Sequence, residues 1–367
     1  MSGHVLQVFQ PDVGGVPGYV ATLVEGLIDR GWQVTVASPP RTTVSDRLRD
    51  AGVAVVPGPI SRAPRLREEH RVVSRLVARC RSSRVDVVHA HSTKAGLVAG
   101  VAGRAAGVPT VYTPHAWCFD MKVPAPLRLA MGTGEAIMAR FAHSAIAVVS
   151  EHERRLATTW AIRPSHGVHV IRTGLPDGCP RLDRRSARRA LGLAAQGFVA
   201  AWVGRLGPQK QPDHLAPIAR HAGPAVRIAA LGGGLASSPA GTALVAAGGT
   251  VVDERADARL LYAAADAYVQ TSAWEGLPLS VLEAMQASLP VVAYAVGGVR
   301  EQVRDGTTGS LVAAGDVGGL ARALIALAGD ASLARRQGAA GQRVVGESFR
   351  HDAMIGAYET LYREVAA

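Results

Sequence analysis

The stretch from Ala267 to Ala293 reads AYVQTSAWEGLPLSVLEAMQASLPVVA and predicts one strand–loop–helix–strand unit. The short apolar run Ala267–Gln270 comes before a loop that ends at Pro278. Apolar positions recur at helical spacing from Leu279 onward, and proline is well tolerated in the first turn of a helix. A second apolar run, Val291–Ala293, follows the helix. Strands that alternate with helices in this way are typical of a parallel sheet covered by helices.

The same alternation continues through both halves of the chain. The predicted strands are Val5–Phe9, Gln33–Ala37, Val53–Val56, Val85–His89, Thr110–Thr113, Ala145–Val149, Val199–Val203, Ala225–Leu231, Thr250–Val252, Ala267–Gln270 and Val291–Ala293. The turn-rich segment Arg172–Pro180 reads as a linker between two similar series. We therefore expect an α/β protein of two Rossmann-like domains with parallel sheets facing across a cleft. Their expected ranges are 1–173 and 174–348, followed by a C-terminal helix at 349–367.

Composition narrows the class of protein. The 367 residues are 48% apolar, which is enough for two cores and argues against intrinsic disorder. The net charge of +11 suits anionic partners, although arginine can equally be the default surface cation here. The basic residues are scattered, which argues against nucleic acid as a partner.

Cysteine usage and the N-terminus bear on the compartment. Three separated cysteines, Cys80, Cys118 and Cys179, favour a reducing compartment over a disulfide scaffold or a zinc site. The first twelve residues lack the basic start and apolar run of a signal peptide. We expect a cytoplasmic protein that contacts at most the inner surface of a membrane.

Two segments of the first half are candidate ligand loops. Gly14 and Gly15 lie between the first strand and a predicted helix, where backbone can approach an anion closely, but a tight turn explains them equally well. The segment does not match the nicotinamide fingerprint G-x-G-x-x-G. His115 follows a predicted strand and could hydrogen-bond a substrate hydroxyl, act as an acid or base, or simply cap a loop. His89 and His91, around the fourth strand, are expected to be structural.

Two segments of the second half carry charged residues that could bind a ligand. Arg205 and Lys210 lie five residues apart on one predicted loop, where they could neutralise a diphosphate or remain solvated; the spacing is not that of a Walker A loop. Glu275 and Glu283 lie eight apart, one in a loop and one about two turns into a helix. One carboxylate could bind sugar hydroxyls and the other a ribose, although two glutamates at this spacing are common. The loop Gly232–Gly234 could allow a further close approach at the same edge, but it is expected to be a plain flexible connection.

The segment from Ser272 to Ala293 closely resembles the E-x7-E signature of the large retaining glycosyltransferase family 4. Further motifs resemble that family in the same order along the chain. They are Gly14-Gly15, Val88-His-Ala-His-Ser-Thr-Lys-Ala-Gly96, Tyr112-Thr-Pro-His-Ala-Trp117, Val148-Val-Ser-Glu151, Val203-Gly-Arg-Leu206 with Lys210, and Ala264-Ala-Asp266. The resemblance covers about residues 5 to 365 and implies the GT-B fold, with the donor bound mainly by the second domain and the acceptor mainly by the first. It also implies that the final helix crosses back to the first domain.

The resemblance implies roles for individual residues. Arg205 and Lys210 would bind the donor diphosphate and stabilise the leaving group, which is physically coherent for an enzyme that uses no metal. Glu275 would contact the transferred sugar, and Glu283 would hold the ribose. Backbone N–H groups of the segment Gly276, Leu277, Pro278 and Leu279 would lie close to the donor. His115 would lie beside the reacting sugar. Gly14 and Gly15 would leave room for diphosphate and acceptor. The family retains anomeric configuration by a front-face substitution and needs no cofactor.

Four positions depart from the family's usual pattern. Ala116, Gln211 and Ser288 stand where glycine is common, and Arg300 stands where proline is usual. None of these departures removes a charged ligand, so activity is still expected. Arg300 could change the pocket or point to solvent.

The substrates are less specified than the reaction. The family's frequency favours a UDP-sugar donor, with GDP open, and the motifs around His89 and His115 resemble enzymes that build polysaccharide on lipid carriers. The arginine-rich segment Ser61–Arg84 could rest on an anionic membrane or be a solvated helix face over the core. The alternatives are a soluble natural-product acceptor, as in antibiotic biosynthesis, a nucleotide-sugar epimerase of the same fold, or a non-catalytic binding protein.

Overall fold

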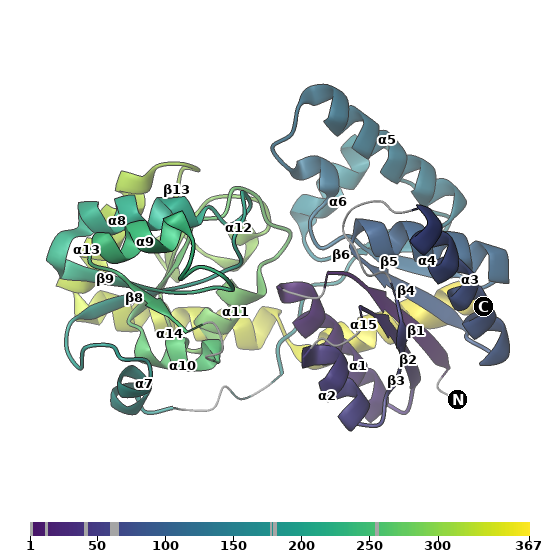
Figure 1. Ribbon diagram of the computed structural model, residues 1–367, viewed down its shortest axis with the longest axis horizontal. Coiled ribbons are helices and arrows are strands. Elements are labelled where there is room, and N and C mark those ends of the chain that lie inside the picture. Colours follow the sequence, from purple (N-terminus) through teal and green to yellow (C-terminus); the bar gives the residue numbers. More distant parts are fainter. Residues whose placement is uncertain are drawn as a thin grey trace. The chain divides into compact units, whose positions relative to one another are not determined.

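The chain forms two compact units (Figure 1). Unit 1 comprises Met1–Pro176 together with His351–Ala367, and unit 2 comprises Asp177–Arg350. The computed structural model describes residues 3–11, 14–39, 43–58, 66–176, 178, 182–253 and 257–367. Part of the predicted linker, Asp177, Cys179 and Pro180, therefore lies outside the described residues, as do Ser61, Arg62 and Arg65 of the arginine-rich segment.

Unit 1 is built on a seven-stranded parallel sheet. Its order is β3 (Ala54–Pro57), β2 (Gln33–Ser38), β1 (His4–Phe9), β4 (Val87–His91), β5 (Thr110–Thr113), β6 (Ala145–Val148) and β7 (Val168–Val170). The connecting helices are α1 (Gly15–Asp29), α2 (Thr43–Asp50), α3 (Leu66–Ser82), α4 (Thr93–Ala106), α5 (Ala125–Phe141) and α6 (Glu151–Thr159). The central strands are buried on both faces, which is why they read as continuous apolar runs.

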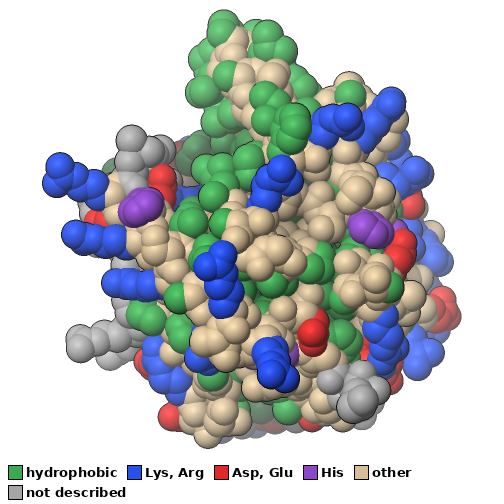
Figure 2. Space-filling model, turned by 90° about the vertical axis from the view of Figure 1, so that its right-hand side faces the viewer, with side chains coloured by type: hydrophobic (Ala, Val, Ile, Leu, Met, Phe, Trp, Pro, Cys, Tyr) green, Lys and Arg blue, Asp and Glu red, His purple; other side chains and the backbone are tan. Residues whose placement is uncertain are grey.

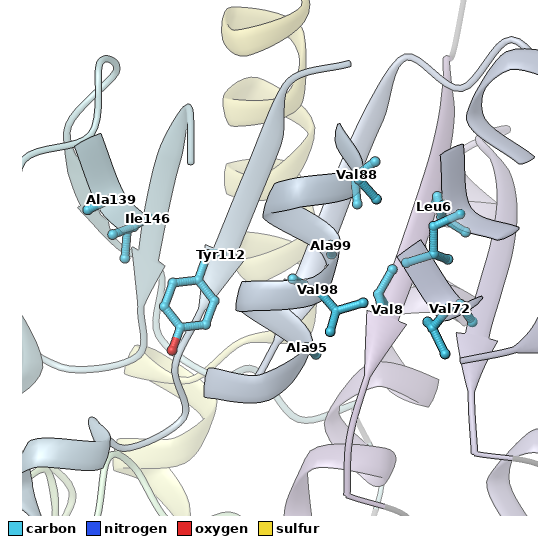
Figure 3. Packing of buried hydrophobic residues seen from close by; sticks show 14 of the residues in the cluster. Leu6, Val8, Val72, Val88, Ala95, Val98, Ala99, Tyr112, Ala139 and Ile146 are labelled. Atoms are coloured by element: carbon cyan, nitrogen blue, oxygen red, sulfur yellow. The ribbon is translucent and has the colours of Figure 1, made fainter. Parts of the chain in front are cut away.

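One face of this sheet carries a core shared by α3, α4 and the strands (Figure 3). Leu6, Val8 and Val88 from the sheet pack with Val72 of α3 and Val98 of α4. The apolar stripe of the arginine-rich segment therefore faces the protein interior, as a solvated helix face over the core requires.

Unit 2 repeats the plan with a six-stranded parallel sheet. Its order is β10 (Thr250–Val252), β9 (Val226–Leu231), β8 (Phe198–Val203), β11 (Ala267–Gln270), β12 (Val291–Tyr294) and β13 (Gly309–Val312). Its helices are α7 (Arg184–Ala190), α8 (Leu215–Ala222), α9 (Pro239–Ala246), α10 (Ala258–Ala264), α11 (Leu279–Gln286), α12 (Val299–Gln302), α13 (Val317–Gly329) and α14 (Ala331–Ser348). The predicted fold of two Rossmann-like domains is confirmed.

Both sheets have a point where the strand order reverses. In unit 1 it lies between β1 and β4, and in unit 2 between β8 and β11. Loops that leave the carboxyl ends of two such strands diverge to opposite faces and open a crevice in which α/β proteins bind ligands. The loops after β8 and β11 carry the two charged segments singled out in the second half of the sequence.

The final helix, α15 (His351–Ala366), belongs to unit 1 (Figure 1, yellow). It packs against α1 and β4 and buries Met354, Ile355, Tyr358, Leu361, Tyr362 and Val365. Each such side chain contributes roughly 1.5–3 kcal/mol of burial free energy, so the helix is firmly held there. The Glu359 carboxylate also accepts hydrogen bonds from Arg30 Nη1 at 2.7 Å and Trp32 Nε1 at 2.9 Å.

The structure adds two strands and shifts a third. Strands β7 and β13 were not predicted; both are short, lie at a sheet edge and are half-buried, which weakens their apolar signal. The fourth strand begins at Val87, not Val85, because Asp86 uses its carboxylate to accept the His4 backbone N–H at 2.7 Å. The shift matters because it places His91 inside the strand.

No single helix of the described residues is long and apolar enough to span a bilayer. One bent pair, Val317–Gly329 with Ala331–Ser348, meets the length and composition criteria together.

Candidate active site

The two charged loops of unit 2 are tied together at the strand-order reversal. Thr271, directly after β11, donates its hydroxyl to the Lys210 carbonyl at 2.6 Å and accepts the Trp202 indole N–H at 2.9 Å. The backbone N–H of Ala273 donates to the Gln209 carbonyl at 2.8 Å. These bonds hold the loop after β8 and the loop after β11 as one surface.

Lys210 and Glu275 form an ion pair on this surface. Lys210 Nζ lies 2.5 Å from Glu275 Oε1, and the side chains are only 15% and 7% exposed. Gln270 Nε2 donates to the same carboxylate at 3.2 Å. Arg205 Nη2 donates to Gln209 Oε1 at 2.7 Å, and the Gln209 amide reaches the Trp274 carbonyl at 3.2 Å. The structure thus brings Arg205, Lys210 and Glu275 together around Gln209.

Glycines let neighbouring backbone pack against the Glu275 loop. A Cβ on Gly298 would lie 1.9 Å from the Gly276 carbonyl oxygen, and a Cβ on Gly297 would lie as close to that of Glu275. Gly297 also has a φ of +46°, and Gly298 donates its N–H to the Glu275 carbonyl at 3.3 Å. Arg300, two residues on, is exposed to solvent.

A similar close approach supports the Arg205 loop. A Cβ on Gly232 would lie 2.1 Å from the Gly204 carbonyl oxygen. The prediction that Gly232–Gly234 is a plain connection is wrong for Gly232, because this position requires the absence of a side chain.

Glu283 lies on α11, where Tyr262 holds it. Pro278 caps the helix, Leu279 is its first residue, and Leu277 is buried before it. The Tyr262 hydroxyl donates to Glu283 Oε2 at 2.9 Å. Burial raises the pKa of the Glu283 carboxyl, and the Tyr262 hydrogen bond opposes that rise.

In unit 1, His115 is held in a tight turn after β5. His115 has a φ of +55° and Ala116 a φ of +101°, a region that glycine favours. His115 Nε2 lies 3.0 Å from His91 Nδ1, and the Tyr19 ring of α1 packs edge-on against His115 with centroids 4.6 Å apart. Burial lowers the pKa of His115 to about 3, so its imidazole is neutral at neutral pH.

The hydrogen-bond chain behind His115 determines which nitrogen carries its proton. Gln7 Nε2 donates to the Tyr362 hydroxyl at 3.1 Å, so Gln7 Oε1 is the atom that faces His91 Nε2 at 2.7 Å. An amide oxygen only accepts, so His91 is protonated on Nε2 and its Nδ1 accepts. His115 must then donate from Nε2, which leaves His115 Nδ1 as a hydrogen-bond acceptor without a partner among the described residues.

Glu153 on α6 holds the same turn by hydrogen bonds. Its fully buried carboxylate accepts the Ala116 N–H at 2.6 Å and the Val149 N–H at 2.9 Å, and its backbone carbonyl accepts the Trp117 indole N–H at 3.0 Å. Burial raises the pKa of Glu153 to about 7 against the lowering effect of the two backbone donors.

Of the other candidate residues of unit 1, Gly14 and Gly15 follow β1 and His89 lies within β4. Gly14, with a φ of +97°, precedes α1, and Gly15 is its first residue; both are exposed. Asp12 and Val13 of the same loop lie outside the described residues. His89 is buried between the Tyr362 hydroxyl at 2.6 Å and the Thr113 hydroxyl at 2.9 Å, as a structural histidine should be.

Comparison with known proteins identifies the family. Residues 183–344 match the model of the glycosyl transferases group 1, and residues 14–174 match that of the glycosyl transferase 4-like domain. The chain is 30% identical to a D-inositol 3-phosphate glycosyltransferase of Mycolicibacterium paratuberculosis, across 98% of this chain and 89% of that protein. The chain belongs to the group 1 glycosyltransferases.

Solved structures agree on the fold of this glycosyltransferase. The crystal structure of Anabaena Alr3699/HepE in complex with UDP-glucose superimposes with a TM-score of 0.84 at 22% identity, covering 98% of this chain and 100% of that one. Sucrose-phosphate synthase from Thermosynechococcus elongatus gives 0.78 at 21% identity, covering 99% of each chain. Both similarities support the GT-B fold, and the family identifies an enzyme that uses a nucleotide sugar.

Several residues of the glycosyltransferase site were missed by sequence reasoning. They are polar side chains that hold the predicted residues in place: Gln7, Glu153, Gln209, Tyr262 and Gln270. His91, which was expected to be structural, contacts both Gln7 and His115. A usable signal existed for Gln7 and Gln270, since each is a buried polar residue within an otherwise apolar strand. Among the described residues, no group of three or more His, Cys, Asp or Glu could hold a metal ion.

Proposed function

We propose that this glycosyltransferase transfers a sugar from a UDP-sugar to an acceptor hydroxyl, with retention of anomeric configuration and without a metal. The observation that carries the proposal is the partly buried Lys210–Glu275 ion pair beside Arg205, at the strand-order reversal of unit 2. Such a cluster offers cations for a diphosphate and a carboxylate for sugar hydroxyls. The UDP-glucose complex of Anabaena HepE, which has the same fold, supports UDP as the nucleotide.

In this proposal the donor replaces the contacts that the charged groups make with each other. Lys210 and Arg205 turn to the diphosphate, and Glu275, still held by Gln270, accepts hydrogen bonds from the sugar. The Glu283 carboxylate, positioned by Tyr262, accepts the ribose hydroxyls. The backbone N–H groups of Gly276, Leu277 and Leu279 at the start of α11 lie toward the developing negative charge.

The chemical step follows from these contacts. The bond between the anomeric carbon and the diphosphate oxygen breaks, and the acceptor oxygen bonds to that carbon on the same face. The acceptor proton passes to the departing diphosphate, whose charge Lys210 and Arg205 stabilise. These two cations supply the charge that a metal ion would otherwise provide.

Unit 1 is proposed to bind the acceptor and to position the reacting sugar through His115. Because its imidazole is neutral and accepts at Nδ1, His115 would orient a hydroxyl group and would not serve as a general acid. Gly14 and Gly15 would leave room for the substrates.

For the acceptor, we propose a lipid-linked saccharide in polysaccharide biosynthesis, on the motifs around His89 and His115. The second candidate is a soluble phosphorylated polyol, which the names of the relatives that act on inositol 3-phosphate favour. A soluble natural product is a third possibility of the same chemistry. The family match favours transfer over the epimerase alternative.

The test is release of UDP from a panel of UDP- and GDP-sugars, each with a polyprenyl-linked saccharide, inositol 3-phosphate or no acceptor. We expect acceptor-dependent UDP release and a product with the donor's anomeric configuration by NMR. Equal turnover without acceptor would support epimerisation or hydrolysis. Failure to bind any sugar nucleotide would contradict the proposal.

A further inference from the structure

An apolar surface of unit 1 takes no part in the proposed chemistry. Eleven large hydrophobic side chains of the described residues are exposed, and six of them lie on two helices, α4 and α5. They are Leu97, Val101, Leu127, Leu129, Ile137 and Phe141, each between 43% and 61% exposed. Scattered exposed hydrophobics are ordinary, but a cluster of this kind marks an interaction surface.

The exposed face of α5 is unusual for a helix at a protein surface. All residues from 125 to 130 are exposed, followed further along the helix by Gly134, Ile137 and Phe141. The buried side is anchored by Gly132 against the Trp160 ring and by Glu135, which accepts the Tyr112 hydroxyl at 3.2 Å. Figure 2 shows hydrophobic side chains gathered on the projecting part of unit 1, at the height at which Figure 1 draws α5.

The buried side of α4 meets the residue that follows α5. A Cβ on Gly100 of α4 would lie 3.0 Å from the Cβ of Ala142, the residue after Phe141. Leu97 and Val101 lie one turn apart on the exposed side of α4. The six apolar side chains thus extend over two adjoining helices.

The exposed charged side chains of α4 and α5 that lack an ion-pair partner among the described residues are all arginines. Arg104, Arg128 and Arg140 are exposed there and form no ion pair with any described residue. We call these three arginines and the six apolar side chains the α4–α5 surface. The one acidic residue of α4 and α5 is Glu135, which is buried. By contrast α3, the helix of the arginine-rich segment, carries two glutamates in its first turn and turns Val72 into the core.

We propose that the α4–α5 surface docks the protein on a bilayer that contains anionic lipids. Leucine, isoleucine and phenylalanine side chains can enter the interfacial region, while arginines beside them pair with lipid phosphates. A solvent-facing surface with uncompensated cations is poorly suited to a second copy of this chain, because like charges would meet across a twofold interface. The docking does not depend on the proposed acceptor.

The experiment is flotation of the full chain with vesicles of phosphatidylglycerol and phosphatidylcholine, against vesicles of phosphatidylcholine alone, at low and high salt. We expect binding to the anionic vesicles that weakens with salt. The double variant Leu129→Glu/Ile137→Glu should reduce the bound fraction about tenfold or more, because charged side chains cannot enter the interface. Arg128→Glu/Arg140→Glu should remove the preference for anionic lipid.

Matched control variants distinguish the α4–α5 surface from the rest of the molecule. Ile325→Glu changes an exposed apolar side chain, 39% accessible, on α13 of unit 2 and should leave vesicle binding unchanged. Arg71→Glu/Arg75→Glu on α3 should reduce binding less than the α5 charge reversal. Thermal unfolding should show that each variant is folded.

Three outcomes would overturn the proposal. The proposal is wrong if wild-type protein does not bind anionic vesicles, or if Leu129→Glu/Ile137→Glu protein binds them as well as wild type. A dimer in solution that this variant dissociates, without any vesicle binding, would assign the surface to a second copy. Because the vesicles contain no acceptor, UDP release with a soluble acceptor tests the proposed function separately.

Discussion

The two units share one architecture and differ in how their proposed site residues are neutralised. In unit 2 the loops after β8 and β11 carry full charges, which pair with each other as Lys210 and Glu275. In unit 1 the turn after β5 carries His115, which is neutral and linked through His91 to an amide. In the proposed function, unit 2 exchanges an internal ion pair for a charged ligand, and unit 1 orients a hydroxyl group.

The largest expected effect on activity comes from removing the lysine of the ion pair in unit 2. Lys210→Ala should lower kcat/KM about 10²–10³-fold, because it removes a cation from the leaving diphosphate. It also leaves the Glu275 carboxylate buried without its partner, so sugar-nucleotide affinity should fall as well. Initial rates of UDP release and calorimetric titration with the donor measure the two effects.

Lys122→Ala is the control, since Lys122 is an exposed lysine of unit 1 outside the proposed site. The double variant Lys210→Ala/Glu275→Gln should fold more stably than Lys210→Ala alone, because it no longer buries an unpaired carboxylate. Unchanged donor affinity in Lys210→Ala would place the diphosphate elsewhere.

The second prediction concerns the pH dependence of stability in unit 1, where burial raises the pKa of Glu153 to about 7. The folded state holds this proton more tightly than the unfolded state, whose pKa is near 4.5. The free energy of unfolding should therefore fall as the pH rises from about 4.5 to 7, by about 3 kcal/mol in total. Glu153→Gln should lack this contribution, so wild type should lose stability relative to it across that window.

Denaturant midpoints of wild type and Glu153→Gln, measured in steps between about pH 4.5 and 8, test this sign. Glu151→Gln controls for removal of a carboxylate from the same helix. A wild-type protein that gains stability relative to Glu153→Gln as the pH rises would show that the two backbone donors outweigh burial.

A smaller effect is expected from the chain that orients His115. His91→Phe keeps a ring in place but removes the acceptor for His115 Nε2–H, so kcat/KM should fall about 10–100-fold. Donor affinity should change little, because the proposed diphosphate and ribose contacts lie in unit 2. Nitrogen-15 NMR of labelled histidine should show His115 unprotonated at Nδ1 in wild type, and in a mixture of tautomers in the variant.

Gln7→Leu should reproduce the His91→Phe effect, and the double variant should cost no more than either single change, because both act through one hydrogen-bond chain. Additive losses would show that the two residues act separately. A His115 proton on Nδ1 in wild type would reverse the direction of every bond in the chain.

The sequence predicted the loops that carry the charged residues better than the side chains that hold those residues. Strand and helix periodicity placed Arg205, Lys210 and Glu275 on two loops, and topology then brings those loops together. The partners Gln209 and Tyr262 could not be predicted, because a hydrogen bond between distant elements leaves no periodic pattern. The same applies to Glu153, which reads as an ordinary residue of an exposed helix until its carboxylate is seen beneath the turn at Ala116.

The departures from the family pattern became interpretable only with backbone angles. Ala116, Gln211 and Ser288, where the family commonly has glycine, have φ values of +101°, +45° and +61°. The chain therefore keeps a positive φ at all three positions without the residue that adopts it most easily. The sequence identifies the substitution, but only the structure shows that the backbone conformation is retained.

The smallest expected effect concerns the stability of unit 2 at one of these positive-φ positions. Ser288 follows α11, the helix of the E-x7-E segment, in the left-handed position where glycine usually ends a helix. Its side chain is exposed, so Ser288→Gly should raise the free energy of unfolding of unit 2 by about 0.5–1 kcal/mol without changing kcat/KM. Ala287→Gly is the matched control and should destabilise by a similar amount, because Ala287 has an ordinary φ of −76°.

Ala116→Gly makes the same change in unit 1, where the turn carries His115. It should relieve more strain, since φ is +101°, but it also loosens the turn and should lower kcat/KM where Ser288→Gly does not. Thermal unfolding and initial rates of the two variants, measured side by side, distinguish strain that serves the site from strain that does not. If Ala116→Gly gains stability and keeps full activity, the turn at His115 is held by Glu153 and His91 alone.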